Sequence, residues 1–185
     1  PCIRLTVDGL KGGHSGAEIH KNRANANKVM GDFLGRIQKL MPLCLTSFSG
    51  GSKDNAIPQA CQATVVAMGI GLERINDIAA QLPPEVRETY DEPEALVQAF
   101  DVDALGGNAL TTAATADVIS LLCAAPNGVQ AYCPDMPELV QTSLNLGIAK
   151  LGDRFTATFS VRSSVNAEKE GLITKLKELA DFYNG

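Results

Sequence analysis

Hydrophobic residues alternate with polar ones in several short segments of the chain, and in other segments they recur every three or four residues. A period of two predicts a strand with one buried face, and spacings of three and four predict an amphipathic helix. We therefore expect strands over residues 3–8, 43–48, 62–68, 95–102, 139–148 and 155–161. Helices are expected over residues 29–41, 72–82, 111–125 and 166–183.

Residues with special backbone preferences mark the ends of these elements. Asn22 or Asn25 is expected to cap the first helix, and Asn166 the last, because an asparagine oxygen can accept the free N–H groups of a first turn. Pro83-Pro84 is expected to end the second helix, since proline lacks the N–H that a helix interior needs. Residues 9–16 contain four glycines and are expected to form a loop.

The order of the expected elements indicates the fold class. The first six follow the order strand-helix-strand-strand-helix-strand, which is that of a split βαβ, or ferredoxin-like, sandwich. The next four, helix-strand-strand-helix, repeat this order without a closing strand. We expect an α+β fold with an antiparallel sheet, possibly extended or duplicated, and helices on one face. One domain over residues 1–185 is expected, with possible sub-units 1–103 and 104–185.

Composition narrows the classes of function. With 45% hydrophobic residues among 185, the chain can bury a globular core. The net charge is −5 and no basic cluster occurs, which argues against a nucleic-acid partner. No apolar run approaches the roughly 20 residues that span a bilayer, so no membrane partner is expected. Five cysteines without a C-x-x-C spacing favour buried free thiols in a reducing cytosol.

The chain offers few groups for a complete catalytic site. Only two histidines occur, His14 and His20, and their spacing of six would put them on different faces of a helix. A metal site within this chain is therefore not expected. Ser15 follows His14 directly, but a nucleophile and its base rarely meet as sequence neighbours. The glycines resemble a phosphate loop, yet no Lys-Ser/Thr pair follows them.

What remains is His14 on a glycine-rich loop between a strand and a helix. Such a loop can bring the backbone close to a ligand and place the imidazole at a rim. A neutral imidazole can donate a hydrogen bond to a developing oxyanion. The alternative is a loop histidine held by local hydrogen bonds, and the residues alone favour this alternative because surface histidines are common.

A longer pattern surrounds this loop. Residues 7–20 read VDGLKGGHSGAEIH, and residues 23–28 read RANANK. Both segments resemble the signature of the aminoacyl-histidine dipeptidases, which are cytosolic two-zinc peptidases. Three further segments fit the same family in the expected order, namely residues 50–58, 139–147 and 161–164.

The resemblance implies a function for the chain as part of a larger protein. It is similar to the lid, which also carries the dimer contact, of a cytoplasmic homodimeric dipeptidase that hydrolyses Xaa-His and related dipeptides. The two zinc ions would be bound outside this fragment, and the fragment alone would be inactive. The rival hypothesis is a stand-alone ferredoxin-like module that binds a ligand or regulates, because that fold supports many functions.

Three residues acquire roles from the resemblance. His14 matches a lid histidine that polarises the scissile carbonyl and stabilises the oxyanion, in many relatives within the partner subunit's site. Asn55 matches an asparagine that hydrogen-bonds substrate, and Arg162 an arginine that grips the terminal carboxylate. Without the resemblance, Asn55 could simply cap a turn and Arg162 could be a solvated surface charge.

Overall fold

The computed structural model describes residues 1–69, 71–103 and 108–183. The first part of the chain contains β1 (Cys2–Asp8), β2 (Gly13–His14), the short 3-10 helix η1 (Ile19–Lys21), α1 (Ala26–Gln38), β3 (Leu43–Gly50), β4 (Ala56–Ile57), β5 (Cys61–Ala67), α2 (Leu72–Thr89) and β6 (Leu96–Val102). The second part contains α3 (Thr112–Ala124), β7 (Gly128–Cys133), β8 (Met136–Leu151), β9 (Phe155–Ser163) and α4 (Asn166–Phe182).

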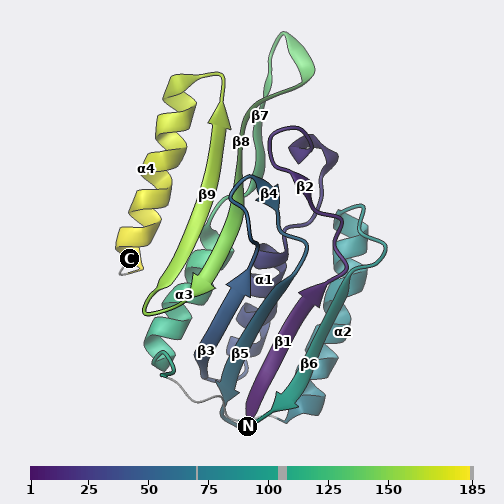
Figure 1. Ribbon diagram of the computed structural model, residues 1–185, viewed down its shortest axis with the longest axis vertical. Helices are drawn as coiled ribbons and strands as arrows, with labels where there is room; N and C mark the ends of the chain where they lie inside the picture. Colours follow the sequence, from purple (N-terminus) through teal and green to yellow (C-terminus); the bar gives the residue numbers. More distant parts are fainter. Residues whose placement is uncertain (70, 104–107, 184–185) are drawn as a thin grey trace.

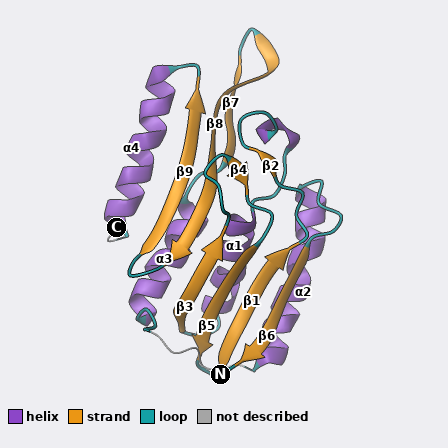
Figure 2. Cartoon of the chain, in the orientation of Figure 1, coloured by secondary structure: helices purple, strands orange, loops and turns teal. Residues whose placement is uncertain are grey.

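Seven of these strands form one sheet in the order β6-β1-β5-β3-β8-β7, with β9 paired to β8 (Figure 1). Every pairing in it is antiparallel. The first four strands have the ferredoxin-like order, and β8 extends the sheet beyond β3. Helices α1, α2 and α3 lie behind the sheet, and α4 lies beside β9 (Figure 2). The expected α+β, ferredoxin-like and extended sheet is confirmed.

The hydrophobic core lies between the sheet and the helices. Ile3, Leu5 and Val7 alternate along β1 and are all buried, as their period of two predicts. They face Phe33 and Ile37 of α1 within the same cluster of buried residues. Each such side chain contributes roughly 1.5–3 kcal/mol through its removal from water. The cap of α1 is Asn25, whose side chain accepts hydrogen bonds from the amides of Asn27 and Lys28.

Two expected helix boundaries are wrong. Helix α2 continues through Pro83 and Pro84 to Thr89. Its apolar stripe extends beyond the prolines to the buried Val86, so core packing outweighs the missing amide donors. Helix α4 begins with Asn166 as its first helical residue, and Asn166 does not cap it. The hydroxyl of Ser163 instead accepts the Val165 amide just before the helix.

The two parts of the sheet meet along a short seam. β3 pairs with β8 at only Ser49↔Lys150 and Gly50↔Ala149. β7, a strand that the sequence pattern did not predict, pairs with the same edge of β8 farther along, from Leu144 to Met136. The expected boundary at 103/104 adjoins residues 104–107, which lie outside the described residues. A division into sub-units remains a prediction.

Between β7 and β3, side chains replace a strand along the edge of β8. The amide of Leu146 donates to Oδ1 of Asn127 at 2.9 Å. The carbonyl of Leu146 accepts from Nδ2 of Asn25 at 3.0 Å and from Nδ2 of Asn27 at 3.3 Å. Asparagine amides therefore satisfy the backbone of Leu146, which no strand covers at this point.

The cysteines are free, but the expectation that they are buried is mostly wrong. Of the five, only Cys61 is buried, and burial raises the pKa of its thiol. Cys123 is exposed, although its sulfur lies 3.4 Å from the carbonyl oxygen of Gly31 on α1. Over the described ranges, no helix combines the length and apolar character that crossing a bilayer requires.

Candidate functional site

The three residues singled out in the sequence lie at one end of the sheet. His14 forms part of β2, Asn55 directly precedes β4, and Arg162 lies at the end of β9. Figure 1 shows β2, β4 and the arrowhead of β9 in the upper half of the molecule. All three residues are exposed. The fold thus gathers residues that are up to 148 positions apart in the numbering, from 14 to 162.

Glycines give the His14 loop its shape. Gly12 and Gly13 have φ values of 63° and 140°, which residues other than glycine rarely adopt. The loop then pairs with the chain around Asn55, with His14 opposite Ala56 in the β2–β4 ladder. The amide of Ser15 donates to the carbonyl of Asn55 at 2.9 Å. The loop and the Asn55 segment therefore form one hydrogen-bonded unit.

The carboxylate of Glu18 holds the His14 loop in place. Oε2 of Glu18 accepts the backbone amide of His14 at 2.9 Å. Glu18 also forms ion pairs with Lys21 at 2.9 Å and Arg23 at 3.2 Å. The hydrogen bond from the His14 amide, followed by the contacts with Lys21 and Arg23, lowers the pKa of Glu18 to about 2. Arg23 also donates to the carbonyl of Gly12.

The imidazole of His14 is oriented by the turn that follows it. Nδ1 accepts hydrogen bonds from the amides of Gly16 and Ala17, each at 3.1 Å. Because Nδ1 is an acceptor, the neutral ring carries its proton on Nε2. The local hydrogen bonds considered for this residue are therefore present, and within the described ranges Nε2–H has no acceptor.

Arg162 lies against the same turn. A Cβ placed on Gly16 would stand 2.9 Å from the guanidinium carbon of Arg162 and 3.1 Å from Cε1 of His14. Both side chains therefore lie next to the bare backbone of Gly16. Among the described residues, no carboxylate or other acceptor holds the guanidinium. Its five donors are free for an anionic ligand.

The side chain of Asn55 makes no hydrogen bond within the described part of the chain. It therefore does not cap the turn that was considered as its alternative role. Its backbone, in contrast, is held on both sides. The Ser15 amide donates to its carbonyl, and the neighbouring carbonyls of Asp54 and Ala56 accept from the buried Asn145.

Gly16 and Asn145 carry much of this geometry, and the sequence did not assign either of them a role. Both lie within the segments that carry the family resemblance, which is the signal that could have singled them out. Residue type alone does not suggest them, because glycine is common in loops and asparagine in turns.

No group of three or more His, Cys, Asp or Glu side chains that could hold a metal occurs in the ranges that the structure describes. These residues therefore do not assemble the ligands that two zinc ions need. That the ions bind outside this chain remains a prediction.

Comparisons with known proteins show what the chain is similar to. Residues 5–92 match the family model described as Peptidase dimerisation domain. The cytosol non-specific dipeptidase of Escherichia coli (strain K12) is 32% identical over 179 residues, which are 96% of this chain and 37% of that protein. The crystal structure of aminoacylhistidine dipeptidase from Vibrio alginolyticus superposes with a TM-score of 0.88 at 29% identity, over 99% of this chain and 38% of that chain.

The chain thus spans less than two fifths of the length of either relative. The likeness in sequence and in fold nevertheless extends over almost all of its own residues, in agreement with the signature around His14. Residues 5–92 thus resemble a peptidase dimerisation domain, and the chain as a whole is similar to one part of these dipeptidases.

Proposed function

We propose that this chain is the lid and dimerisation domain of a longer cytoplasmic dipeptidase, which hydrolyses Xaa-His and related dipeptides. The name of one relative, an aminoacylhistidine dipeptidase, supports the Xaa-His class, and the name of the other, a cytosol non-specific dipeptidase, supports a wider range of dipeptides. Two zinc ions would be bound by another part of the enzyme, and the enzyme would act as a homodimer through this domain. The chain alone is expected to be inactive.

The proposal rests on one observation: the side chains of His14 and Arg162 both lie next to Gly16. A dipeptide has its scissile carbonyl and its terminal carboxylate only one residue apart, and consecutive Cα atoms are about 3.8 Å apart. A donor for the carbonyl oxygen and a clamp for the carboxylate must therefore be close neighbours. His14 Nε2–H and the unpaired Arg162 guanidinium have that relation.

Each residue then has a distinct role. Nε2–H of His14 donates to the carbonyl oxygen as negative charge develops on it, and the turn amides keep the ring in position. Arg162 binds the terminal carboxylate through paired N–H groups and fixes the register of the substrate. Asn55 donates its side-chain amide to the substrate. Closure of the lid brings these groups in together and excludes water.

Steady-state kinetics of the complete enzyme test these roles. Replacing His14 by Ala should lower kcat about 10²- to 10³-fold, the usual effect of losing one oxyanion donor. Replacing Arg162 by Ala should mainly raise KM, because the carboxylate is bound in ground and transition states alike. His20, the other histidine, is exposed on η1 and serves as the matched control. A His14→Ala enzyme with normal kcat would refute the oxyanion role.

A further inference from the structure

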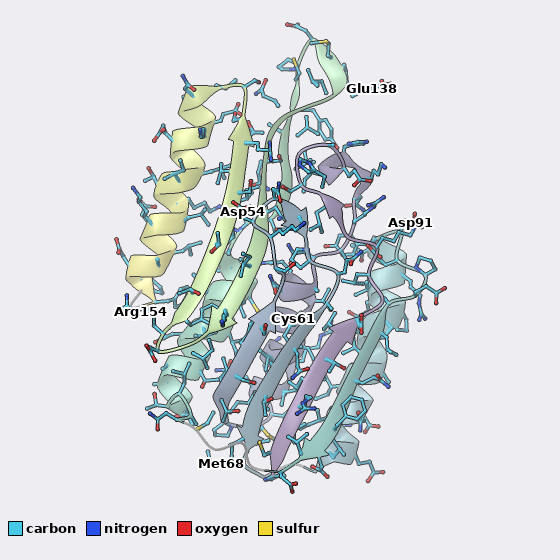
Figure 3. All side chains as sticks on the ribbon, viewed as in Figure 1. Asp54, Cys61, Met68, Asp91, Glu138 and Arg154 are labelled. Carbon is cyan, nitrogen blue, oxygen red and sulfur yellow. The ribbon has the colours of Figure 1, made fainter. Side chains whose placement is uncertain are left out.

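The segment around Asn55 lies between the His14 loop and β8, and it is hydrogen-bonded to both. Three consecutive carbonyls, those of Asp54, Asn55 and Ala56, are all hydrogen-bonded. The Asn55 carbonyl accepts from the Ser15 amide at 2.9 Å. The other two accept from Nδ2 of Asn145, Ala56 at 2.8 Å and Asp54 at 3.3 Å. Asp54, labelled in Figure 3, lies at this crossing beside β8.

Asn145 is itself held in one orientation. Its side chain is 1% exposed. Its Oδ1 accepts from Nδ2 of Asn25 at 3.2 Å, so its nitrogen must point to the carbonyls of the Asn55 segment. Asn25 cannot rotate either, because its own Oδ1 caps α1 by accepting the Asn27 amide at 3.0 Å. A chain of buried amides thus runs from the start of α1 to the Asn55 segment.

Asn145 also connects this segment to Arg162. On β8 it pairs with Ser160 of β9, two residues before Arg162. We infer that Asn145 is a positioning residue of the proposed peptidase site, which sets the distance between the Asn55–His14 unit and the Arg162 clamp. The inference rests on the proposed function. Asn145 touches no substrate and acts through the backbone on either side of Asn55.

Loss of the Asn145 amide should loosen the unit without unfolding the domain. In an Asn145→Ala variant of the complete enzyme, the Ser15 amide should exchange with solvent at least about tenfold faster, because its acceptor on Asn55 is no longer held. Dipeptide kcat/KM should fall about 10- to 100-fold, since a misplacement of 1 Å can cost about that much.

Asn27→Ala is the matched control. Asn27 is equally buried, and its amide also donates to two backbone carbonyls, those of Gly50 and Leu146. Neither carbonyl flanks Asn55. Hydrogen exchange by mass spectrometry, thermal unfolding and kinetics are compared for the two variants. We expect similar unfolding temperatures but faster Ser15 exchange and lower kcat/KM only in Asn145→Ala.

A second variant tests the same contact in case Asn145→Ala does not fold. Asn25→Asp retains the oxygen that caps α1 but loses the amide that orients Asn145, so it should show the same pattern more weakly. Equal Ser15 exchange and equal kcat/KM in all three variants would overturn the inference. If the enzyme hydrolyses no dipeptide, or ignores His14→Ala, the proposed function fails instead, and the exchange rates still decide whether Asn145 holds the segment.

Discussion

Gly16 offers a sharp test of the proposed site, because its lack of a side chain leaves room for both His14 and Arg162. A methyl group there would stand 2.9 Å from the guanidinium carbon of Arg162, where ordinary contact begins at 3.4 Å. Cε1 of His14, at 3.1 Å, would also be too close. Each group would have to retreat by several tenths of an ångström, and both are ends of flexible side chains.

The Gly16→Ala substitution should therefore affect activity and leave stability unchanged. The φ of Gly16 is not positive, so alanine adds no backbone strain. A loss of 1 Å in positioning can cost about 100-fold, which puts the expected fall in kcat/KM at about tenfold, or about 1.4 kcal/mol. The free energy of unfolding should change by less than about 0.5 kcal/mol or rise slightly.

Dipeptide hydrolysis by the complete enzyme and thermal unfolding provide the two measurements. Gly171→Ala is the control, since a Cβ there would meet nothing within 4 Å. If Gly16→Ala keeps full activity while its unfolding temperature is unchanged, the two side chains do not act together over this turn. A large fall in unfolding temperature would mean that the backbone around Gly16 has less room than described.

Three further outcomes are expected. Mixing His14→Ala subunits with Arg162→Ala subunits should restore no activity, because one chain supplies both groups; recovery to about a quarter of the normal rate would show that two chains share the site. The pKa of Glu18, lowered from 4.5 to about 2, means that its carboxylate stabilises the loop above pH 4.5 and that this effect is lost as the pH falls toward 2. The protection of the His14 amide, measured as its exchange rate relative to that of an unstructured amide at the same pH, should therefore fall over that range, and a Glu18→Gln variant should show no such pH dependence. Gly147→Ala would put a methyl group 2.4 Å from a backbone carbonyl oxygen. It should lower the free energy of unfolding by about 1–3 kcal/mol in chemical denaturation, unlike Gly171→Ala.

Local patterns in the sequence predicted most of the elements because each pattern reports its own burial. The alternation in β1 and the apolar stripe of α1 are examples. The pattern failed where distant contacts decide the outcome. α2 continues past Pro83 because Val86 packs in the core and Glu85 pairs with Arg36 of α1. β7 was missed because its residues alternate only weakly and gain their order from β8.

The site, too, could be predicted from the sequence only in part. The loop around His14 could be recognised from residue type and order, because glycines and a histidine lie together there. The approach of Arg162 could not, since it depends on the register of β9 against β8 and on where β8 crosses the sheet. The role of Asn145 depends on a chain of three-dimensional contacts that residue spacing does not encode.

The asparagines beside Leu146 have a consequence for the solubility of the domain. β8 is its longest strand, and a long strand with an unpaired edge tends to recruit strands from other molecules. β3 and β7 protect the two ends of that edge, while Asn25, Asn27 and Asn127 protect the gap. Loss of these amides would leave the backbone of β8 around Leu146 unpaired, so that a strand from another molecule could pair there. Asn25, which orients Asn145 on one side, therefore also covers part of an edge at which strands of other molecules could pair.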